Sequence, residues 1–321
     1  MTHGKDLALA GLAIAAFLLS LAIGADGAGL PGSADAARTI LFEVRLPRAI
    51  LGFLVGAALG LAGAVLQGYL RNPLAEPGIL GISGGAALGA VIAIHTGIAG
   101  VAAAALPFAG LVGAGIATLL LVMLAGAGSS SVTLILAGVA ISSLSGALTS
   151  LALNLAANPF AVSEMLYWLM GSLSDRSLVH VWIAAPAILL GIVFLLSTAT
   201  ALDALTLGED AAQNLGVDPG RLRWQVVGGT ALAVGAATAV TGAISFVGLV
   251  VPHVLRPWLG NEPGRLLVPS LFGGAALVLL ADVGLRLISP LGELRLGVLT
   301  ALVGAPFFLW LVLRLRRDLA P

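Results

Sequence analysis

Long apolar runs alternate with short polar connections over the whole chain. Charged residues, proline and glycine bound nine such runs, at about 7–24, 47–67, 79–98, 106–125, 132–153, 179–200, 225–255, 266–288 and 297–313. Most are close to the ~20 residues that a helix needs to cross a bilayer. The pattern predicts an all-α integral membrane protein with a single transmembrane domain over residues 1–321.

The first run, 7–24, follows Lys5, as the apolar core of a signal peptide would. It is long for such a core, and residues 23–28 make only a loose cleavage site. We therefore interpret 7–24 as the first span, with a cleaved signal peptide as the alternative.

The run at 225–255 is longer than one crossing requires, and Gly242, Gly248 and Pro252 interrupt it. It fits either one long tilted helix or two passes, at 225–243 and 246–258, joined by a tight turn. Two passes bring the total to ten spans and place nine of the fifteen basic residues on the side of the termini: Lys5, Arg71, Arg221, Arg223, Arg256, Arg265, Arg314, Arg316 and Arg317. Nine spans would leave six there. Because cytoplasmic loops carry an excess of Lys and Arg, we expect ten spans with both termini cytoplasmic.

Composition agrees with a lipid environment and excludes several function classes. Of 321 residues, 59% are apolar and 9% charged, whereas a soluble domain carries about 25% charge. Fifteen basic residues balance fifteen acidic ones, so no nucleic-acid partner is expected, and the absence of Cys excludes thiol chemistry. The only lysine is Lys5, so the chain has no phosphate-binding G-x-x-x-x-G-K-[ST] loop. We expect no cofactor on this chain; any ATP and Mg²⁺ would be bound by partner subunits.

Two connections on the expected cytoplasmic side have unusual patterns. In 71–85, Pro73, Pro77 and several glycines break the helix, and non-helical backbone inside a membrane requires protein or a water-filled cavity around it. The alternative is an ordinary cytoplasmic turn. In 203–223, acids after Gly208 predict a short helix that Gly216 ends, and Asp218-Pro219 predicts the start of a second. Two short helices with little core of their own are expected to pack against a partner.

Charged residues on the expected outer side suggest two roles. Arg38, Arg45 and Arg48 either extend toward lipid headgroups or dock an acidic partner. Asp282 and Arg286 lie four residues apart on one helical face, which favours a structural ion pair over proton transport through Asp282.

His253 lies between Pro252 and Pro257, with no second metal ligand at a suitable spacing. We expect its imidazole to bond backbone groups freed by the prolines, rather than to bind a metal or carry protons.

Two outer segments, 163–171 and 290–297, resemble one another and follow the fifth and ninth spans. If spans two to five correspond to seven to ten, the offset of five is odd, so the halves would be inverted in the membrane, as in many transporters.

With these residues in view, the chain resembles the FecCD family, the permease subunits of type II ABC importers for iron chelates and cobalamin. The matching stretches run over nearly the whole chain and include RLPRAILGFLVGAALGLAGAVLQ (45–67), RNPLAEPGILGISGGA (71–86), LGEDAAQNLGV (207–217) and GAISFVGLVVPHVLRP (242–257). The resemblance implies the BtuC-like fold of type II importers, with ten transmembrane helices in two inverted repeats. It also implies a second copy of the chain, two ATP-binding subunits and a periplasmic or lipid-anchored substrate-binding protein, in the bacterial inner membrane.

The resemblance also implies roles for individual residues. Docking of the binding protein would use Arg45, Arg48 and Arg286. Coupling to the ATPase would use Leu207, Gly208, Glu209, Asp210, Ala211, Ala212, Gly216 and Val217. The cytoplasmic gate would involve Asn72, Leu74 and Ser131, although 129–132 departs from the family pattern, and the outer gate helices would carry Glu164, Trp168 and Glu293. Spans five and ten would line the pathway at the dimer axis.

We therefore expect a permease that moves a metal chelate by alternating access while a partner hydrolyses ATP. A ferric siderophore is the first expectation for the cargo, followed by heme and cobalamin. The alternative is an ion-coupled secondary transporter without an ATPase partner, for which the spans offer almost no ionisable groups beyond Asp282 and His253.

Overall fold

The computed structural model describes residues 2–24, 27–29, 33–126, 130–156, 158–288 and 294–318, and most of them are helical. The helices are α1 (Thr2–Ala22), α2 (Ala34–Thr39), α3 (Leu46–Tyr69), α4 (Ile82–His95), α5 (Ala105–Ala125), α6 (Ser131–Asn154), α7 (Pro159–Leu169), α8 (Leu178–Leu196), α9 (Ala199–Leu205), α10 (Glu209–Asn214), α11 (Pro219–Thr241), α12 (Val247–Leu259), α13 (Pro263–Ile288) and α14 (Leu296–Asp318). A π-helical turn, η1 (Ile40–Arg45), joins α2 to α3, and two 3₁₀ turns are η2 (Pro77–Leu80) and η3 (Ile98–Gly100). A minimal antiparallel hairpin pairs β1 (Ile23–Gly24) with β2 (Gly27–Ala28). The predicted all-α class is confirmed.

Eight helices in the described part of the chain are long and apolar enough to cross a membrane. They include α2, η1 and α3, which together form one helix over Ala34–Tyr69. The two shorter apolar helices, α4 and α12, lie where the sequence predicts the third and eighth spans. Each follows a non-helical segment, 70–81 before α4 and 242–246 before α12, apart from the turn η2.

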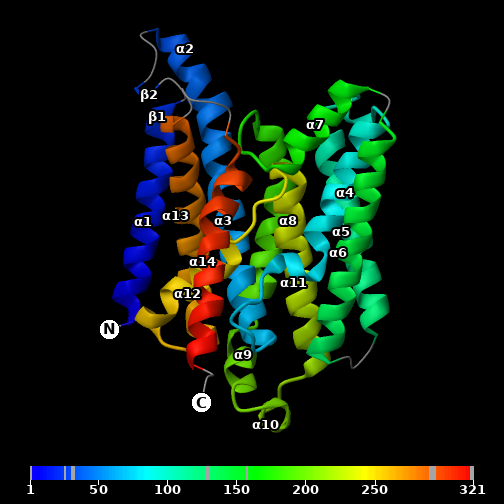
Figure 1. The fold of residues 1–321 in the computed structure, drawn as a ribbon. Helices are drawn as coiled ribbons and strands as arrows, with labels where there is room; N and C mark the ends of the chain where they lie inside the picture. Colours follow the sequence, from blue (N-terminus) through cyan, green and yellow to red (C-terminus); the bar gives the residue numbers. More distant parts are fainter. Residues whose placement is uncertain are drawn as a thin grey trace.

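The start of α1 and the end of α14 lie at the same end of the bundle as α9 and α10 (Figure 1). We call this the α10 end. The opposite end carries α2 and α7 and is called the α7 end (Figure 1). An even number of crossings follows from this arrangement, because the chain enters and leaves the bundle at one end.

The apolar run at 225–255 is divided between two helices. Helix α11 ends at Gly242, whose φ of +73° favours glycine, and α12 begins after Phe246, which also has a left-handed φ of +67°. One long helix is therefore excluded. Asp218 accepts hydrogen bonds from the backbone N–H groups of Gly220 and Arg221, as predicted for an N-cap. The helix that it begins is the whole of α11, however, and not a separate short helix, because the apolar sequence continues without a break.

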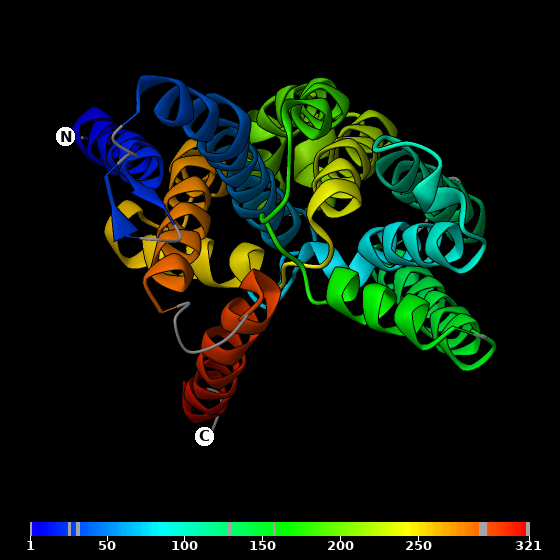
Figure 2. The ribbon, with the colours of Figure 1, turned by 90° about the horizontal axis from the view of Figure 1, so that it is seen from above.

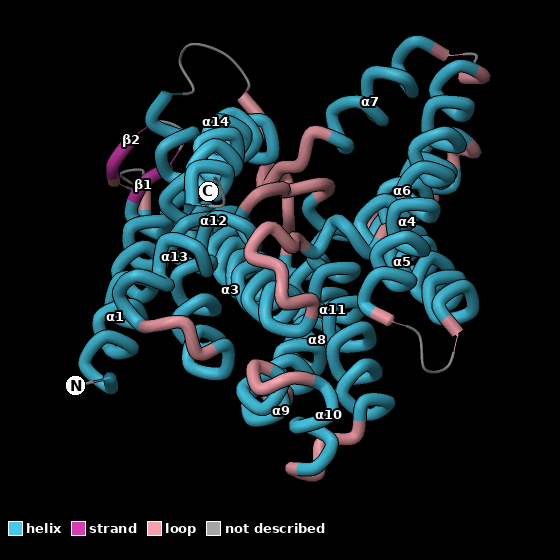
Figure 3. Tube along the Cα trace, turned by 60° about the horizontal axis from the view of Figure 1, so that its bottom comes forward, coloured by secondary structure: helices cyan, strands magenta, loops and turns pink. Residues whose placement is uncertain are grey.

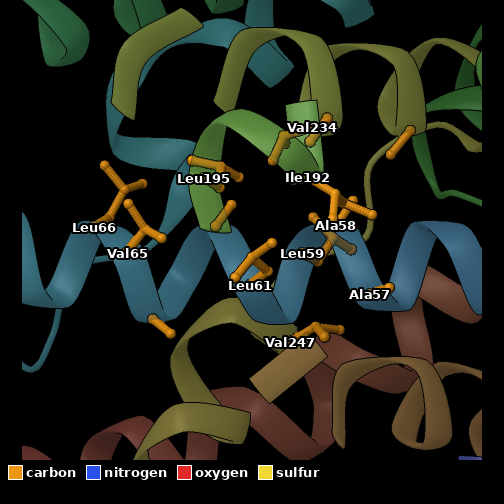
Figure 4. Close-up of a cluster of buried hydrophobic side chains, with 14 of the residues drawn as sticks. Ala57, Ala58, Leu59, Leu61, Val65, Leu66, Ile192, Leu195, Val234 and Val247 are labelled. Atoms are coloured by element: carbon orange, nitrogen blue, oxygen red, sulfur yellow. The ribbon is translucent and has the colours of Figure 1, made fainter. Parts of the chain in front are cut away.

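Helix α3 is the centre of the core, and α8, α11, α12 and α13 pack around it (Figure 4). Glycines permit the closest approaches: a Cβ at Gly56 would overlap the backbone of Gly274, and one at Gly63 would overlap the carbonyl of Gly248. Without a hydrophobic force between helices in lipid, such contacts supply the van der Waals packing that holds the bundle together.

Two edges of the bundle carry exposed apolar side chains. Seen from above, α14 extends from one side, and α6 with α7 forms another (Figure 2). Leu302 and Leu309 on α14, and Val132 and Leu136 on α6, are all more than half exposed. These faces contact lipid or another protein.

Helix α1 packs along α13, as expected for a membrane span. At its start, the Lys5 ammonium donates to the backbone carbonyl of Trp258 at the end of α12. The first apolar run is therefore an integrated part of the bundle.

Candidate functional site

Three arginines and one aspartate form a buried cluster near the α7 end. Arg48 donates to both carboxylate oxygens of Asp282, at 2.7 to 3.1 Å, and Nη2 of Arg286 lies 2.9 Å from Asp282 Oδ2. The ion pair between Asp282 and Arg286 is thus confirmed. The pairing with Arg48 was not predicted, because that residue comes from α3, far away in the sequence.

Two of these arginines also bind the end of α1. Arg45 donates to the carbonyls of Leu21, Ala22 and Gly29, at 2.7 to 3.0 Å. Arg286 donates to the carbonyl and hydroxyl of Ser20, at 2.9 and 2.6 Å, and to the carbonyl of Ile23. The last carbonyls of a helix lack intrahelical donors and carry partial negative charge, so guanidinium groups stabilise them.

These contacts determine which predicted docking residues reach the surface. Arg45 and Arg286 are buried, while the side chain of Arg48 is 16% exposed against 1% for Asp282. Arg48 lines a cavity of about 220 Å³ near the α7 end, together with Ser172, Ser174, Asp175, Asp282, Leu285, Arg286, Leu294, Arg295 and Leu296. Beside this cavity, burial lowers the pKa of the Arg176 guanidinium, and the neighbouring Asp175 carboxylate opposes that shift.

The two non-helical segments meet inside the bundle. A carboxylate oxygen of Glu76 accepts a 2.6 Å hydrogen bond from the backbone N–H of Phe246, at the start of α12. Gln67 donates to the carbonyl of Gly248 at 3.2 Å and accepts from Arg256 at 2.9 Å. The expectation that protein surrounds the break in 71–85 is therefore confirmed. The polar side chain of Gln67 within an apolar run is the sequence signal for this network.

The residues predicted at the cytoplasmic gate occupy two places. Asn72 and Leu74 are half-buried in the turn after α3, where the Asn72 side-chain oxygen accepts from the Leu74 backbone N–H at 2.9 Å. Ser131 is the first residue of α6, one residue from the predicted start of the fifth span. Helix α6 approaches η2 through Gly138, which packs on the backbone of Ile79. Seven residues separate Ser131 from Gly138, about 10 Å along the helix.

The polar stretch after α8 projects from the α10 end (Figure 3). As predicted, a short helix, α10, begins after Gly208 with Glu209 and Asp210 in its first turn, and Gly216 follows its end with a φ of +90°. Within α10, Ala212 is buried and Ala211 is half-buried, and Val217 after it is also half-buried. Arg71 and Glu209 form a 2.9 Å ion pair that joins α10 to the turn after α3.

Two exposed leucines flank α10. Leu207 is 68% exposed and Leu215 is 65% exposed. Large apolar side chains this exposed, on a segment that projects from the bundle beside Glu209 and Asp210, are typical of a protein interface.

The described part of the second outer segment, 294–297, lies beside the first, 163–171. The backbone N–H of Gly297 donates to the Gly171 carbonyl at 3.2 Å, and both glycines pack against the carbonyl of Ala243. Helix α7 carries Glu164, which is exposed, and Trp168, which is buried. The guanidinium of Arg295 lies 4.9 Å from the centre of the Tyr167 ring. Glu293 lies outside the described residues.

His253 differs from its expected role. Its Nδ1 atom is buried without a hydrogen-bond partner, so the bond to freed backbone is not observed. Its ring instead packs edge-on against Phe307 of α14, with 5.6 Å between ring centres. The imidazole acts as an aromatic contact between α12 and α14.

Comparison with known proteins identifies the family. The model of the FecCD transport family matches residues 6–314. The chain belongs to the FecCD transport family. This agrees with the resemblance seen in the sequence.

Relatives and one solved structure support this assignment. The chain is 41% identical over 276 residues to the vitamin B12 import system permease protein BtuC of Vibrio vulnificus, covering 86% of this chain and 83% of that protein. It is 38% identical to the cobalamin import system permease protein BtuC of Halobacterium salinarum, covering 88% and 75%. A metal-chelate type ABC transporter in an inward-facing conformation superposes with a TM-score of 0.87 at 33% identity, covering 96% of this chain and 98% of that one.

Membership in this family makes the chain a multi-pass permease of an ABC importer. It implies ATP-binding subunits and a substrate-binding protein as partners, and it does not favour the secondary transporter.

Proposed function

We propose that this chain is the permease of an ATP-driven importer that moves a metal chelate across the bacterial inner membrane. The FecCD match over residues 6–314 is the observation that carries the proposal. The transporter would contain two copies of this chain, each with ten spans in two inverted repeats and both termini cytoplasmic. Two partner subunits would bind ATP and Mg²⁺, and a periplasmic or lipid-anchored protein would deliver the cargo.

The coupling surface of this proposal is the segment 207–217. Exposed Leu207 and Leu215 would enter a cleft of the ATP-binding subunit, beside Glu209 and Asp210. The ion pair between Arg71 and Glu209 gives movement of α10 a direct route to the turn after α3.

From that turn, movement would reach the gate. Glu76 lies in the same turn and accepts a hydrogen bond from the start of α12. The turn after α3 and the start of α12 would therefore shift together. Asn72 and Leu74 in this turn and Ser131 on α6 would narrow the cytoplasmic mouth. In alternating access, this gate would open while the outer gate, near Trp168 and the 289–297 segment, is closed, and close while the outer gate is open.

The exposed apolar faces of α6 and α14 support a dimer with the pathway at its axis. Small and apolar residues dominate both helices, so a bulky cargo would be held weakly and released readily.

Docking of the binding protein is proposed at the arginine cluster. Arg48 reaches the cavity near the α7 end and would meet acidic side chains of the partner. Arg45 and Arg286 would act by holding the cluster against α1.

Cobalamin is the first cargo to test, because two relatives at 38% and 41% identity are named for its import. Ferric siderophores and heme are the other candidates.

Uptake by the reconstituted complex tests the proposal. Proteoliposomes with this chain, its ATP-binding subunit and its binding protein are expected to accumulate labelled cobalamin or another chelate only with ATP. Glu209→Ala combined with Asp210→Ala should abolish uptake while the dimer still purifies. Uptake that is driven by a pH gradient without the ATP-binding subunit would overturn the importer in favour of the secondary transporter.

A binding assay tests the docking surface. Arg48→Gln should weaken binding of the substrate-binding protein at low salt, because Asp282 keeps Arg286 as a partner and the cluster survives. Arg265→Gln, at the α10 end, is the control and should leave binding unchanged. Equal affinities of both variants would argue against the cluster as a docking site.

A further inference from the structure

Two cavities join on the face formed by α5, α8 and α11. One, of about 210 Å³, lies between the end of α5 and the start of α11, and the other, of about 400 Å³, continues along α5 and α11. Val122 and Trp224 line both, so they form one groove. This face lies away from α14 (Figure 2).

The groove has the depth of one membrane leaflet. Its lining runs from Leu111 to Gly126, about 22 Å along α5, and from Gly220 to Leu232, about 18 Å along α11. Half of a bilayer measures about 15 Å of hydrocarbon plus about 5 to 7 Å of headgroup region. The groove begins at the α10 end and is about as long as one leaflet is deep.

The surface end of the groove is cationic. Arg223 lines it, donates to the carbonyl of Gly126 and brings a permanent positive charge to the rim. Arg221 is exposed two residues away. The Asp218 carboxylate keeps its negative charge while it accepts at the N-cap of α11, so the two guanidinium groups leave the start of α11 with a net positive charge. Trp224 is also at this end of the groove and is 62% exposed. Tryptophan is enriched at the headgroup level of membranes.

The inner end of the groove is apolar. Its one side-chain hydroxyl, on Thr118, donates to the carbonyl of Ala114 at 2.7 Å and is satisfied within α5. Gly115 and Gly228 open the space, because a Cβ at either position would meet no atom within 4 Å. This end suits a hydrocarbon chain.

We propose that this groove binds an anionic glycerophospholipid. The phosphate lies at Arg223 and Arg221, the glycerol beside Trp224, and one acyl chain fills the groove toward Leu111. The cationic rim and the leaflet depth favour a lipid over a protein segment, because a protein occupant would not require a charge at one end and hydrocarbon at the other.

Native mass spectrometry of the intact transporter tests the site. The complex is reconstituted in vesicles of phosphatidylglycerol mixed with phosphatidylcholine, extracted in mild detergent and analysed for retained lipid. We expect the wild type to retain phosphatidylglycerol in preference. Gly115→Leu combined with Gly228→Leu fills the groove and should reduce retained phosphatidylglycerol by at least about tenfold, or about 1.4 kcal/mol of binding free energy.

Two further variants make the result specific. Gly11→Leu places the same side chain on an exposed face of α1, again with no atom near the added Cβ, and should retain lipid like the wild type. Arg221→Gln leaves the contact between Arg223 and Gly126 intact and should lower the preference for phosphatidylglycerol without loss of folding, checked by the melting temperature. Unchanged retention in the filled-groove variant, or equal retention of the two lipids by the wild type, would overturn the proposal.

Discussion

Asp282 is the anion that pairs with two arginines inside the bundle. It is buried, and its carboxylate binds two guanidinium groups, those of Arg48 and Arg286. Arg286 is buried and Arg48 is partly buried, and two such cations that share one anion gain stability only while that anion is present. The cluster also fixes the end of α1, because Arg286 donates to Ser20. This residue is therefore a structural centre of the α7 end of the bundle.

Asp282→Ala should lower the stability of the permease by about 3 to 5 kcal/mol, because it leaves the buried Arg286 and the partly buried Arg48 without their anion. The measurement is the thermal unfolding of the purified protein in detergent. Glu262→Ala removes the exposed ion pair with Arg265, and its effect should stay below about 0.5 kcal/mol. Similar melting temperatures for both variants would contradict the structural role of Asp282.

At the scale of elements, the close contact of α3 and α12 depends on paired glycines. Gly63 lies against the backbone of Gly248, and Pro77 from the turn after α3 packs on the same glycine. The start of α12 is therefore enclosed by α3 on one side and by the broken segment on the other.

Gly63→Ala should destabilise the protein by about 1 to 3 kcal/mol, the usual cost of overpacking, since its methyl group would overlap the Gly248 carbonyl. Gly11→Ala adds the same methyl group where no atom lies nearby, and its melting temperature should equal or exceed that of the wild type. A Gly63→Ala protein as stable as the Gly11→Ala control would show that α12 does not pack this closely.

The N-cap residue of α12 is Phe246, and a side chain from a distant part of the chain binds its backbone N–H. The carboxylate of Glu76 accepts from the Phe246 N–H, a role that a neighbouring side chain usually fills. Glu76→Ala should cost about 1 to 2 kcal/mol of stability, whereas Glu76→Gln keeps an acceptor oxygen and should cost less. Differential scanning fluorimetry of both variants checks the order. Equal losses would indicate that the carboxylate acts by its charge instead.

At the scale of the whole molecule, the two ends of the bundle differ in character. The α7 end holds a buried charge cluster and the contact of Gly171 with Gly297, while the α10 end projects a short acidic helix with exposed leucines. The ion pair between Glu209 and Arg71 joins α10 to the turn after α3. In the same turn, Glu76 accepts a hydrogen bond from the backbone N–H of Phe246 at the start of α12. These contacts are the ones through which the proposed coupling to an ATP-binding subunit would act.

Leu207→Glu combined with Leu215→Glu should prevent copurification of the ATP-binding subunit. Affinity should fall at least about tenfold, because apolar anchors at an interface contribute on the order of 1 to 2 kcal/mol each. Both side chains are exposed, so the melting temperature of the permease alone should not change. The matched control is Val101→Glu, because Val101 is also exposed but lies near the α7 end. A variant that still copurifies its partner would place the interface elsewhere.

Local chemistry made several features predictable. The glycines and acids at 208–216 encode a short helix, and Asp218-Pro219 encodes a helix start, because capping depends on neighbours in sequence. The spacing of Asp282 and Arg286 likewise determines their ion pair. By contrast, the role of His253 was misjudged, because its contact with Phe307 depends on how α12 meets α14.

The sequence by itself determined the lipid environment, the apolar segments and the family, because these depend on composition, periodicity and motif order along the chain. Only the tertiary structure decided that Arg48 joins Asp282, that Glu76 caps α12 and that Arg45 and Arg286 bind the end of α1. Each of these contacts joins elements that are distant in sequence. Their geometry follows from the packing of glycine-rich helices against one another, which no local pattern specifies.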